Sequence, residues 1–386
     1  MNHMNHMNRV LSPEIRFAAL LSRPHLNSEQ VALAAALTAD VDFGKLHKLI
    51  IQHRIWPCVY CNVRDYLPGL LADSSFNYLN KRYHANVAQS QRSFALCGKL
   101  LRKFKENGVS LKILKGAPLA FKLYGDVSKR YSHDIDLVIR DTDITVANAI
   151  LAREGFQAKG FEGLLPEQES LYWDGHKDIV YLDKFGTMIE LHVRLSVDKL
   201  KITDQYFDAL FNTNTPNNIA HLELIYLCWH GSQTLFHRLK WLVDIALYLE
   251  LQPQTFREEL VRVARDLRAF RMLSASWVLA HQVFDTDLPQ EIFIFYEQDA
   301  ACRILVTQCL IQFDNPKLPN SFASLMTTHF VGALLYQSKK ELFSILLRHF
   351  KPNDNDRNVF PKLPHRLHFI YYLLRPFLVI YRRFHI

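Results

Sequence analysis

The ten residues YSHDIDLVIR place Asp134 and Asp136 two positions apart inside a run that otherwise has the composition of a buried strand. Side chains of an extended chain alternate between two faces, so the two carboxylates share one face and the aliphatic residues between and after them share the other. Two neighbouring negative charges make each other harder to ionise, and a divalent cation is the usual compensation for such oxygen ligands. The stretch therefore predicts a strand with one apolar face and one metal-binding face.

Strand-type patterns are concentrated in the middle of the chain. Apolar residues spaced three and four apart predict helices over residues 12–107, and the same spacing returns from His221 onward. Between these regions helices alternate with strand-type runs, which lie at Val109–Leu114, Asp134–Ile139, Lys177–Leu182 and Thr187–Leu195. The sequence therefore predicts an α+β fold, in which a small mixed sheet forms the core and helical regions flank it on both sides.

The changes of pattern also predict where the parts of the chain begin and end. A length of 386 residues suggests two or three domains. We expect a disordered start at 1–11, an N-terminal helical region at 12–107, an α/β core at 108–215 and a C-terminal helical region at 216–386. The core, of roughly 100 residues, has a common domain size.

Composition narrows the class of protein. The net charge of +8 is a modest basic excess, compatible with nucleotides, nucleic acid or an anionic membrane surface as partners. The six cysteines are too sparse for a disulfide framework, and Cys58-Val-Tyr-Cys61 lacks the second ligand pair of a zinc site, so we expect buried free thiols. With neither a signal peptide nor a long apolar run, the expected location is cytoplasmic.

Two further pieces of sequence belong with the aspartate pair. In Leu114-Lys115-Gly116 a strand is expected to end and turn through glycine into a helix, whose first N–H groups form an anion site that Lys115 would strengthen. Glu190 places a third carboxylate in a later strand. If that strand pairs beside the Asp134 strand, the three carboxylates converge and can hold two Mg²⁺ or Mn²⁺ ions, the arrangement that promotes in-line displacement at phosphorus.

The stretch LKGAPLAFKLYGDVSKRYSHDIDLVIR resembles the signature of a poorly characterised bacterial nucleotidyltransferase family within the polymerase-beta-like superfamily. That superfamily has a glycine turn, a D-x-D strand and a third acidic residue on a later strand, which here would be Gly116, Asp134 with Asp136, and Glu190. A later stretch, HGSQTLFHRLKWLVDIALYL, resembles the helical segment of the family and contains His230, His237, Arg238, Trp241 and Asp244. The resemblance spans about residues 45–250.

The chain departs from the superfamily pattern at two positions. Ala117 follows the turn glycine where serine is usual, although Lys115 could substitute for the serine as a point charge. The third carboxylate is a glutamate, Glu190, where aspartate is usual, and its longer side chain changes the reach to a metal.

The resemblance implies transfer of an NMP, with ATP as the favoured donor and AMP as the group transferred, to a hydroxyl acceptor with release of pyrophosphate. Asp134 and Asp136 would bind both metals, and Glu190 would bind the catalytic metal and orient or deprotonate the acceptor. The residues expected to bind the nucleotide are Lys115, Gly116, Arg130 and Ser132. The acceptor stays open: a protein, a tRNA end, a sugar or a small metabolite.

Two other functions compete with this one. A glycosyltransferase would use the D-x-D to hold a sugar nucleotide through Mn²⁺, which explains the aspartates but neither the Lys-Gly turn nor Glu190. A catalytically degenerate fold would act as a nucleotide-binding scaffold or an antitoxin-like partner, a reading that Ala117 favours weakly and the three carboxylates oppose.

Several polar residues have a structural interpretation beside the functional one. Arg130 either neutralises a triphosphate or pairs with a carboxylate. His192 shares strand parity with Glu190 and is expected to be a hydrogen-bonded structural residue, with catalytic base as the alternative. His230 and His237 are seven residues apart, so on one helix they would share a face, and Asp244 seven residues further on would pair with Arg238 or a histidine.

The segment 361–386 is basic and rich in aromatic residues, and it contains no acidic residue. It is expected to be a final helix packed on the body and broken at Arg375-Pro376. Peripheral contact with a membrane surface and contact with nucleic acid are the alternatives.

Overall fold

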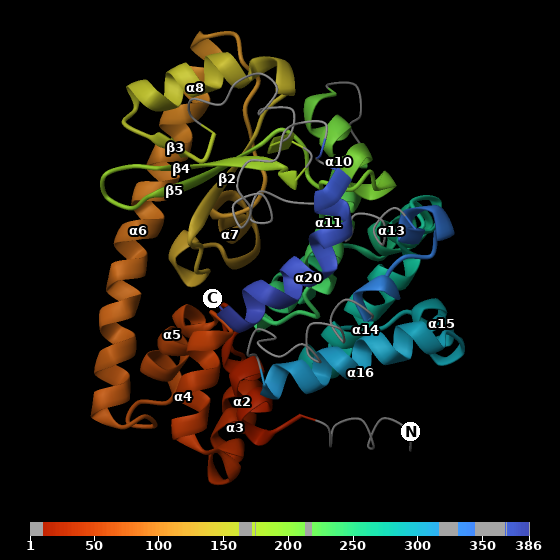
Figure 1. The fold of residues 1–386 in the computed structure, drawn as a ribbon. Helices are drawn as coiled ribbons and strands as arrows, with labels where there is room; N and C mark the ends of the chain where they lie inside the picture. Colours follow the sequence, from red (N-terminus) through yellow and green to blue (C-terminus); the bar gives the residue numbers. More distant parts are fainter. Residues whose placement is uncertain are drawn as a thin grey trace.

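The computed structural model describes residues 11–161, 172–173, 175–212, 218–315, 331–343, 367 and 369–385. Figure 1 shows the sheet at one end of the molecule, the N-terminal helices at the other, and the C-terminal helices along one side. The fold is α+β, as predicted. The expected disordered start falls almost entirely outside the described residues, and the domain boundaries drawn from the sequence stay predictions.

The N-terminal region is helical, as the apolar spacing predicted. Its helices are α2 (Pro13–Leu21), α3 (Ser28–Leu37), α4 (Phe43–Gln52), α5 (Trp56–Tyr66) and α6 (Asp73–Glu106), with a 3₁₀ turn at Thr38–Asp40. Asp42 caps α4 by accepting hydrogen bonds from the first backbone N–H groups of the helix. Pro57 lies in the first turn of α5, where its missing N–H removes no helical hydrogen bond.

The sheet has five strands in the order β1-β2-β5-β4-β3. The strands are β1 (Lys112–Ile113), β2 (Asp134–Val138), β3 (Gln157–Lys159), β4 (Asp178–Leu182) and β5 (Met188–His192). β2 and β5 are parallel and the other pairs are antiparallel, so the sheet is mixed as expected. Strand β3 was not predicted, because its three residues are polar or small and the strand pairs only with β4 at the edge.

Helices α7 (Ala117–Tyr124) and α8 (Ile144–Arg153) lie between strands along the chain, and the later helices follow β5. Figure 1 shows α7 and α8 on opposite sides of the sheet. Short 3₁₀ turns lie at Val127–Lys129 and Asp141–Asp143. The later helices are α10 (Lys201–Phe211), α11 (Ile219–Ser232), α12 (Leu239–Glu250), α13 (Gln254–Asp266), α14 (Phe270–Phe284), α15 (Gln290–Gln298), α16 (Ala300–Asp314) and α20 (Phe369–His385).

The buried apolar residues form two cores. One core lies between the sheet, α8 and the C-terminal half of α6, from which Leu100 and Phe104 are fully buried. The other joins the N-terminal helices to the C-terminal helices and includes Leu79 from the first half of α6. Helix α6 therefore links the two cores, and the helices from both ends of the chain pack together. Cys58 and Cys61 are buried free thiols within the second core, as expected.

Two expectations about the C-terminal half were wrong. His230 and His237 do not share a helix, because α11 ends at Ser232 and α12 begins only at Leu239. The turn between them includes Leu235 and Phe236 with positive φ values of 52° and 50°, a local bend that apolar spacing does not reveal. Helix α20 also runs through Pro376 without a break, because a single proline removes one backbone hydrogen bond and the neighbouring bonds hold the helix together.

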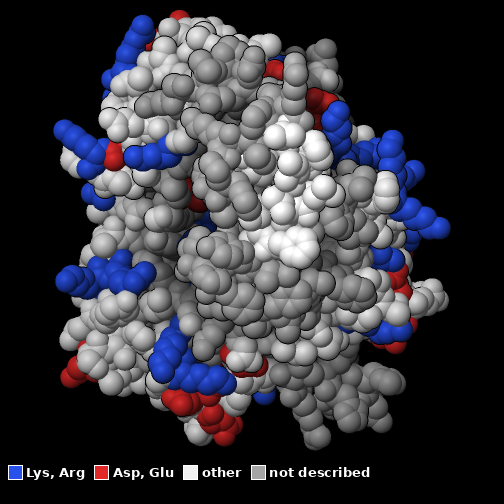
Figure 2. Space-filling view, in the orientation of Figure 1, with Lys and Arg blue, Asp and Glu red and all other residues white. Residues whose placement is uncertain are grey.

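Helix α20 exposes one apolar face. It buries Tyr371 and Leu378 at 2% and 4% exposure, while four large apolar side chains on the other face are 49–69% exposed: Phe369, Tyr372, Leu373 and Phe377. Figure 2 shows this face as an uncharged surface over the position that α20 occupies in Figure 1. Within the described part of the chain, no helix combines the length and the apolar composition needed to span a bilayer.

Candidate active site and metal centre

The parallel pair β2–β5 brings the acidic residues of two distant segments together. Asp136 and Glu190 are direct partners in the register, so their side chains leave the same face of the sheet. Asp136 is 2% exposed, whereas the Glu190 side chain is 23% exposed. The convergence predicted for Asp136 and Glu190 is therefore present. Asp134, at the start of β2, is half-buried and lies nearer to solvent.

His192 completes a cluster of potential metal ligands with these two carboxylates. One ligand atom each from Asp136, Glu190 and His192 lies within 4.8 Å of the others. The His192 Nε2 atom is 3.1 Å from Asp136 Oδ1 and 3.5 Å from Glu190 Oε2. Among the described residues, Asp134 is not part of this cluster.

The chemistry of the cluster fits a divalent cation. Two carboxylate oxygens and an imidazole nitrogen are ordinary ligands for Mn²⁺, and Mg²⁺ prefers the oxygen ligands among them. His192 is 1% exposed, and among the described residues its Nδ1 atom has no hydrogen-bond partner, although Asp178 Oδ2 lies 3.4 Å away. A buried imidazole with one nitrogen toward two carboxylates and the other toward a third has the surroundings typical of a metal ligand.

Lys115 balances the buried charge of Asp136. The Lys115 Nζ atom lies 3.4 Å from Asp136 Oδ1, and the lysine side chain is 14% exposed. Burial by itself would raise the pKa of Asp136, but Lys115 and His192 hold that pKa far below its usual value. Burial opposes the charge on Lys115 in the same way, and Asp136 nevertheless raises the pKa of the lysine above its usual value. Both groups are therefore charged at neutral pH.

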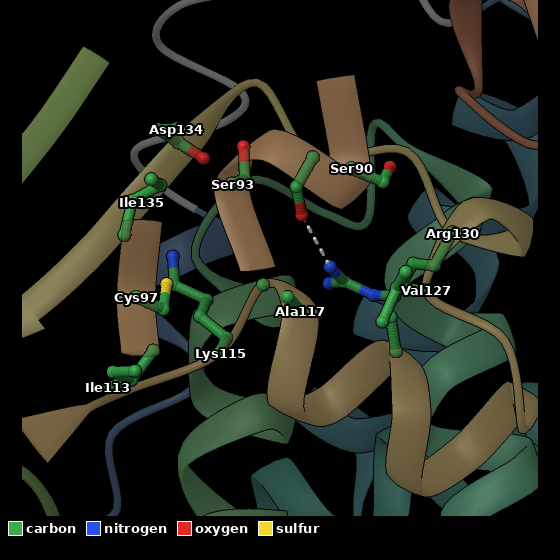
Figure 3. A pocket seen from close by; sticks show the side chains of 13 residues that line it. Ser90, Ser93, Cys97, Ile113, Lys115, Ala117, Val127, Arg130, Asp134 and Ile135 are labelled. Atoms are coloured by element: carbon green, nitrogen blue, oxygen red, sulfur yellow. Dashed lines mark hydrogen bonds between the residues drawn. The ribbon is translucent and has the colours of Figure 1, made fainter. Parts of the chain in front are cut away.

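The turn between β1 and α7 lines a pocket that lies beside this cluster, since Lys115 belongs to the lining and contacts Asp136. Gly116 has φ 71° and ψ −128°, a conformation that side chains other than glycine rarely adopt, and it precedes the first turn of α7. The pocket lining includes Lys115 and Gly116, together with Ser132 and Asp134 from the segment that enters β2. Figure 3 shows that α6 closes the pocket with Ser90, Ser93 and Cys97.

Arg130 lines the same pocket but is committed to a carboxylate. Its guanidinium Nη2 lies 2.8 Å from Asp244 Oδ2, its Nε donates to both oxygens of Asp244, and the two side chains are 3% and 1% exposed. Tyr124 Oη also donates to Asp244, at 2.9 Å. The remaining Arg130 nitrogen, Nη1, donates to Ser132 Oγ at 2.9 Å, the bond drawn in Figure 3. Of the two roles considered for Arg130, the structure shows the pairing with a carboxylate.

The expected partners of Asp244 were wrong. In the part of the chain that the structure describes, Asp244 pairs with Arg130, 114 residues earlier, and not with Arg238 or a histidine. Helical spacing suggested the local partners, but the α11–α12 turn takes His237 out of helix α12 and tertiary packing brings Arg130 to Asp244.

Comparison with known proteins identifies the family. A family model described as an uncharacterised nucleotidyltransferase matches residues 39–285. The chain belongs to this nucleotidyltransferase family. Its matched region begins within the N-terminal helices, contains the whole sheet and the Asp136 cluster, and ends just after α14. No curated protein and no solved structure matches the chain.

The structure of this nucleotidyltransferase family member adds residues that the sequence did not single out. Tyr226 on α11 is 2% exposed; burial raises the pKa of its hydroxyl, while Lys115 and Lys177 oppose that rise because they lie near it. Lys177 precedes β4 and lies 3.4 Å from Asp178. The only signal in the sequence was the alternation of side chains along a strand, which places His192 on the same face as Glu190. Nothing comparable indicated Lys177 or Tyr226, which lie on other segments of the chain.

His230, which the sequence did single out, lies close to these residues. Its ring stacks near Tyr226 at 6.2 Å and meets the edge of Trp241 at 5.1 Å. Desolvation, with Lys115 and Lys177 nearby, holds the pKa of His230 well below its usual value, so the ring is neutral. Tyr226 and His230 of α11 thus form an aromatic group with Trp241 of α12, close enough to Lys115 and Lys177 to feel their charge.

Proposed function

We propose that this protein is a metal-dependent nucleotidyltransferase that transfers an NMP to a hydroxyl acceptor and releases pyrophosphate, with ATP as donor and AMP as the transferred group. The observation that carries the proposal is the buried Asp136–Glu190–His192 cluster beside the glycine turn at Gly116, in a chain of a nucleotidyltransferase family.

The proposed metal site follows from the chemistry of the residues present. Mg²⁺ or Mn²⁺ would be held by Asp136 and Glu190, with His192 and the more exposed Asp134 as further ligands. Bound there, the cation would neutralise phosphate charge and promote attack by the acceptor oxygen.

The chain's own groups would bind the nucleotide and move the proton. The backbone N–H groups of Gly116 and Ala117 at the start of α7, together with Lys115 and Ser132, line the pocket in which the triphosphate would lie. The acceptor oxygen attacks the α-phosphorus, the bond from that phosphorus to the bridging oxygen breaks, and pyrophosphate leaves. Glu190, more exposed than Asp136, would take the acceptor's proton. Arg130 would act by holding the Ser132 hydroxyl in place.

The experiment is a transfer assay. Full-length protein is incubated with each of four α-labelled NTPs, Mg²⁺ or Mn²⁺, and a cell lysate as the source of acceptor. The test variants are Asp136→Asn, which preserves side-chain size, and the double variant Asp134→Ala/Asp136→Ala. Asp141→Asn is the matched control, because Asp141 follows β2 but is exposed.

Label that moves to a product with wild type and Asp141→Asn, and not with the test variants, supports the proposal and identifies the base and the acceptor class. Binding of NTP without transfer to any lysate component would favour the catalytically degenerate scaffold. Absence of NTP binding, with binding of a sugar nucleotide in its place, would favour the glycosyltransferase.

A further inference from the structure

A second pocket lies where the N-terminal helices meet α12. It shares Arg130 with the pocket at Gly116, and four of its nine lining residues are cationic: Arg54, Lys129, Arg130 and Lys240. We call it the basic pocket. Arg54 and Lys129 are half-buried and form its more accessible side, whereas Arg130 and Lys240 are 4% and 7% exposed.

The cations of the basic pocket exceed the carboxylates available to them. Arg130 is paired with Asp244. Lys129 Nζ donates to the carbonyl of Pro24 at 2.8 Å and Lys240 Nζ donates to the carbonyl of Tyr131 at 3.0 Å, and neither acceptor carries a charge. Arg54 lies over the Tyr131 ring, 5.5 Å from its centroid. Within the described ranges, no carboxylate makes an ion pair with Arg54, Lys129 or Lys240.

This excess of buried positive charge is unfavourable without a counter-ion. Burial, with Arg130 and Arg54 nearby, holds the pKa of Lys240 well below its usual value. An anion in the pocket would contact several of these cations at once and remove that penalty, since a buried charge is stable only when it is paired.

The size of the basic pocket indicates how much of a ligand it can hold. Its empty volume is about 200 Å³, including the part open to solvent. Because that figure includes open solvent, the enclosed space is smaller still and suits at most one small anionic group.

We propose that the basic pocket binds a phosphate dianion, as inorganic phosphate or as the terminal group of a phosphate monoester, at a site separate from the nucleotide pocket. Arg130 connects the two sites, since its Nη1 donates to Ser132 Oγ in the nucleotide pocket. The proposal does not depend on nucleotidyl transfer, because the site is defined without a nucleotide or a metal.

The test is calorimetric titration of the full-length protein with inorganic phosphate, then with glycerol 3-phosphate, at constant ionic strength and without metal or nucleotide. The test variants are Lys240→Met and Arg54→Asn, with Lys240→Arg to restore the charge. Asparagine suits position 54, because Arg54 follows the end of α4 with φ 58°. Arg268→Asn is the matched control: Arg268 follows the end of α13 with φ 56° and does not line the pocket.

We expect wild type and Arg268→Asn to bind phosphate equally, Lys240→Met and Arg54→Asn to bind it about tenfold more weakly or worse, and Lys240→Arg to recover most of the affinity. Binding of the monoester as tightly as inorganic phosphate would assign the site to organic phosphates; binding of inorganic phosphate alone would assign it to the free ion. Thermal unfolding of each variant confirms that it is folded.

Two results would overturn the proposal. One is the absence of phosphate binding to the wild type. The other is binding that survives both pocket substitutions and disappears in Lys115→Met, which would place the anion in the nucleotide pocket. Neither result bears on nucleotidyl transfer, which the labelled-NTP assay tests separately.

Discussion

Replacing the members of the Arg130–Asp244 pair one at a time and together tests how the sheet domain is joined to the C-terminal helices. Arg130 precedes β2 and Asp244 lies on α12, so the pair connects the loop that leads to the candidate active site with the helical core. The variants are Arg130→Met, Asp244→Leu and the double variant, which replaces the ion pair by apolar side chains of similar size.

The magnitude follows from burial. Both side chains are almost fully buried, and three contacts of 2.8–3.1 Å join them. Removing one partner leaves an uncompensated buried charge and costs about 3–5 kcal/mol, whereas replacing both is often close to neutral. Asp244→Leu should cost more than Arg130→Met, because Asp244 also counteracts the effect of Arg130 and Arg54 on Lys240, and its loss leaves two buried cations without that carboxylate.

The assay is urea unfolding of the four proteins, from which the coupling free energy is obtained as a double-mutant cycle. We expect a coupling of at least ~3 kcal/mol. Asp287→Asn is the control, because Asp287 is 73% exposed in its pair with Arg257 and its loss should cost less than about 1 kcal/mol. Single substitutions whose costs simply add up in the double variant would refute the reasoning.

Four further outcomes are expected. Asp136→Asn should abolish Mn²⁺ binding measured by electron paramagnetic resonance without nucleotide, and retained binding would contradict the ligand assignment. Gly116→Ala forces a side chain into φ 71°, at a cost of about 1–3 kcal/mol, and should weaken ATP binding in a filter assay while the variant stays folded; unchanged affinity would show that the turn does not hold phosphate. His53 accepts a hydrogen bond at Nδ1 from the N–H of Leu239 and its Nε2 faces the carbonyl of Phe313, so the native ring is neutral, and burial lowers its pKa to about 4. At pH values below ~6.5, the pKa of His53 in the unfolded state, the unfolded protein therefore binds more protons than the native protein. The free energy of unfolding should fall by about 3 kcal/mol between pH 6.5 and 4 in urea titrations, and this loss should be absent in His53→Gln. Finally, the exposed face of α20 and the basic segment 361–386 are proposed to contact anionic membranes: the protein should sediment with phosphatidylserine vesicles, Leu373→Glu should reduce this, and equal sedimentation of both would contradict it.

Much of the fold could be predicted from the sequence because it depends on local geometry. Asp134 and Asp136 share a strand, so the alternation of side chains decides their faces without reference to the rest of the chain. The positive φ of Gly116 follows from a glycine between a strand and a helix-opening proline segment. The convergence of Asp136 and Glu190 depended on whether their two strands pair, and the register shows that they do.

Other features could not be obtained in this way. The seven-residue spacing from His230 to Asp244 implied one continuous helix. The positive φ values of Leu235 and Phe236 instead bend the chain between α11 and α12. The short strand β3 exists because β4 offers it an edge, and its own residues carry no strand pattern.

The sequence by itself determined that helices flank a middle region containing strands, that Asp134 and Asp136 share one face of β2, and that the chain turns at Gly116, because neighbours along the chain decide these features. Only the tertiary structure decided that His192 joins the carboxylates, that Arg130 pairs with Asp244, and that four cations surround a single pocket. Those arrangements join residues from tens to more than a hundred positions apart, and charge and burial act between groups according to their distance in space, which chain spacing does not encode.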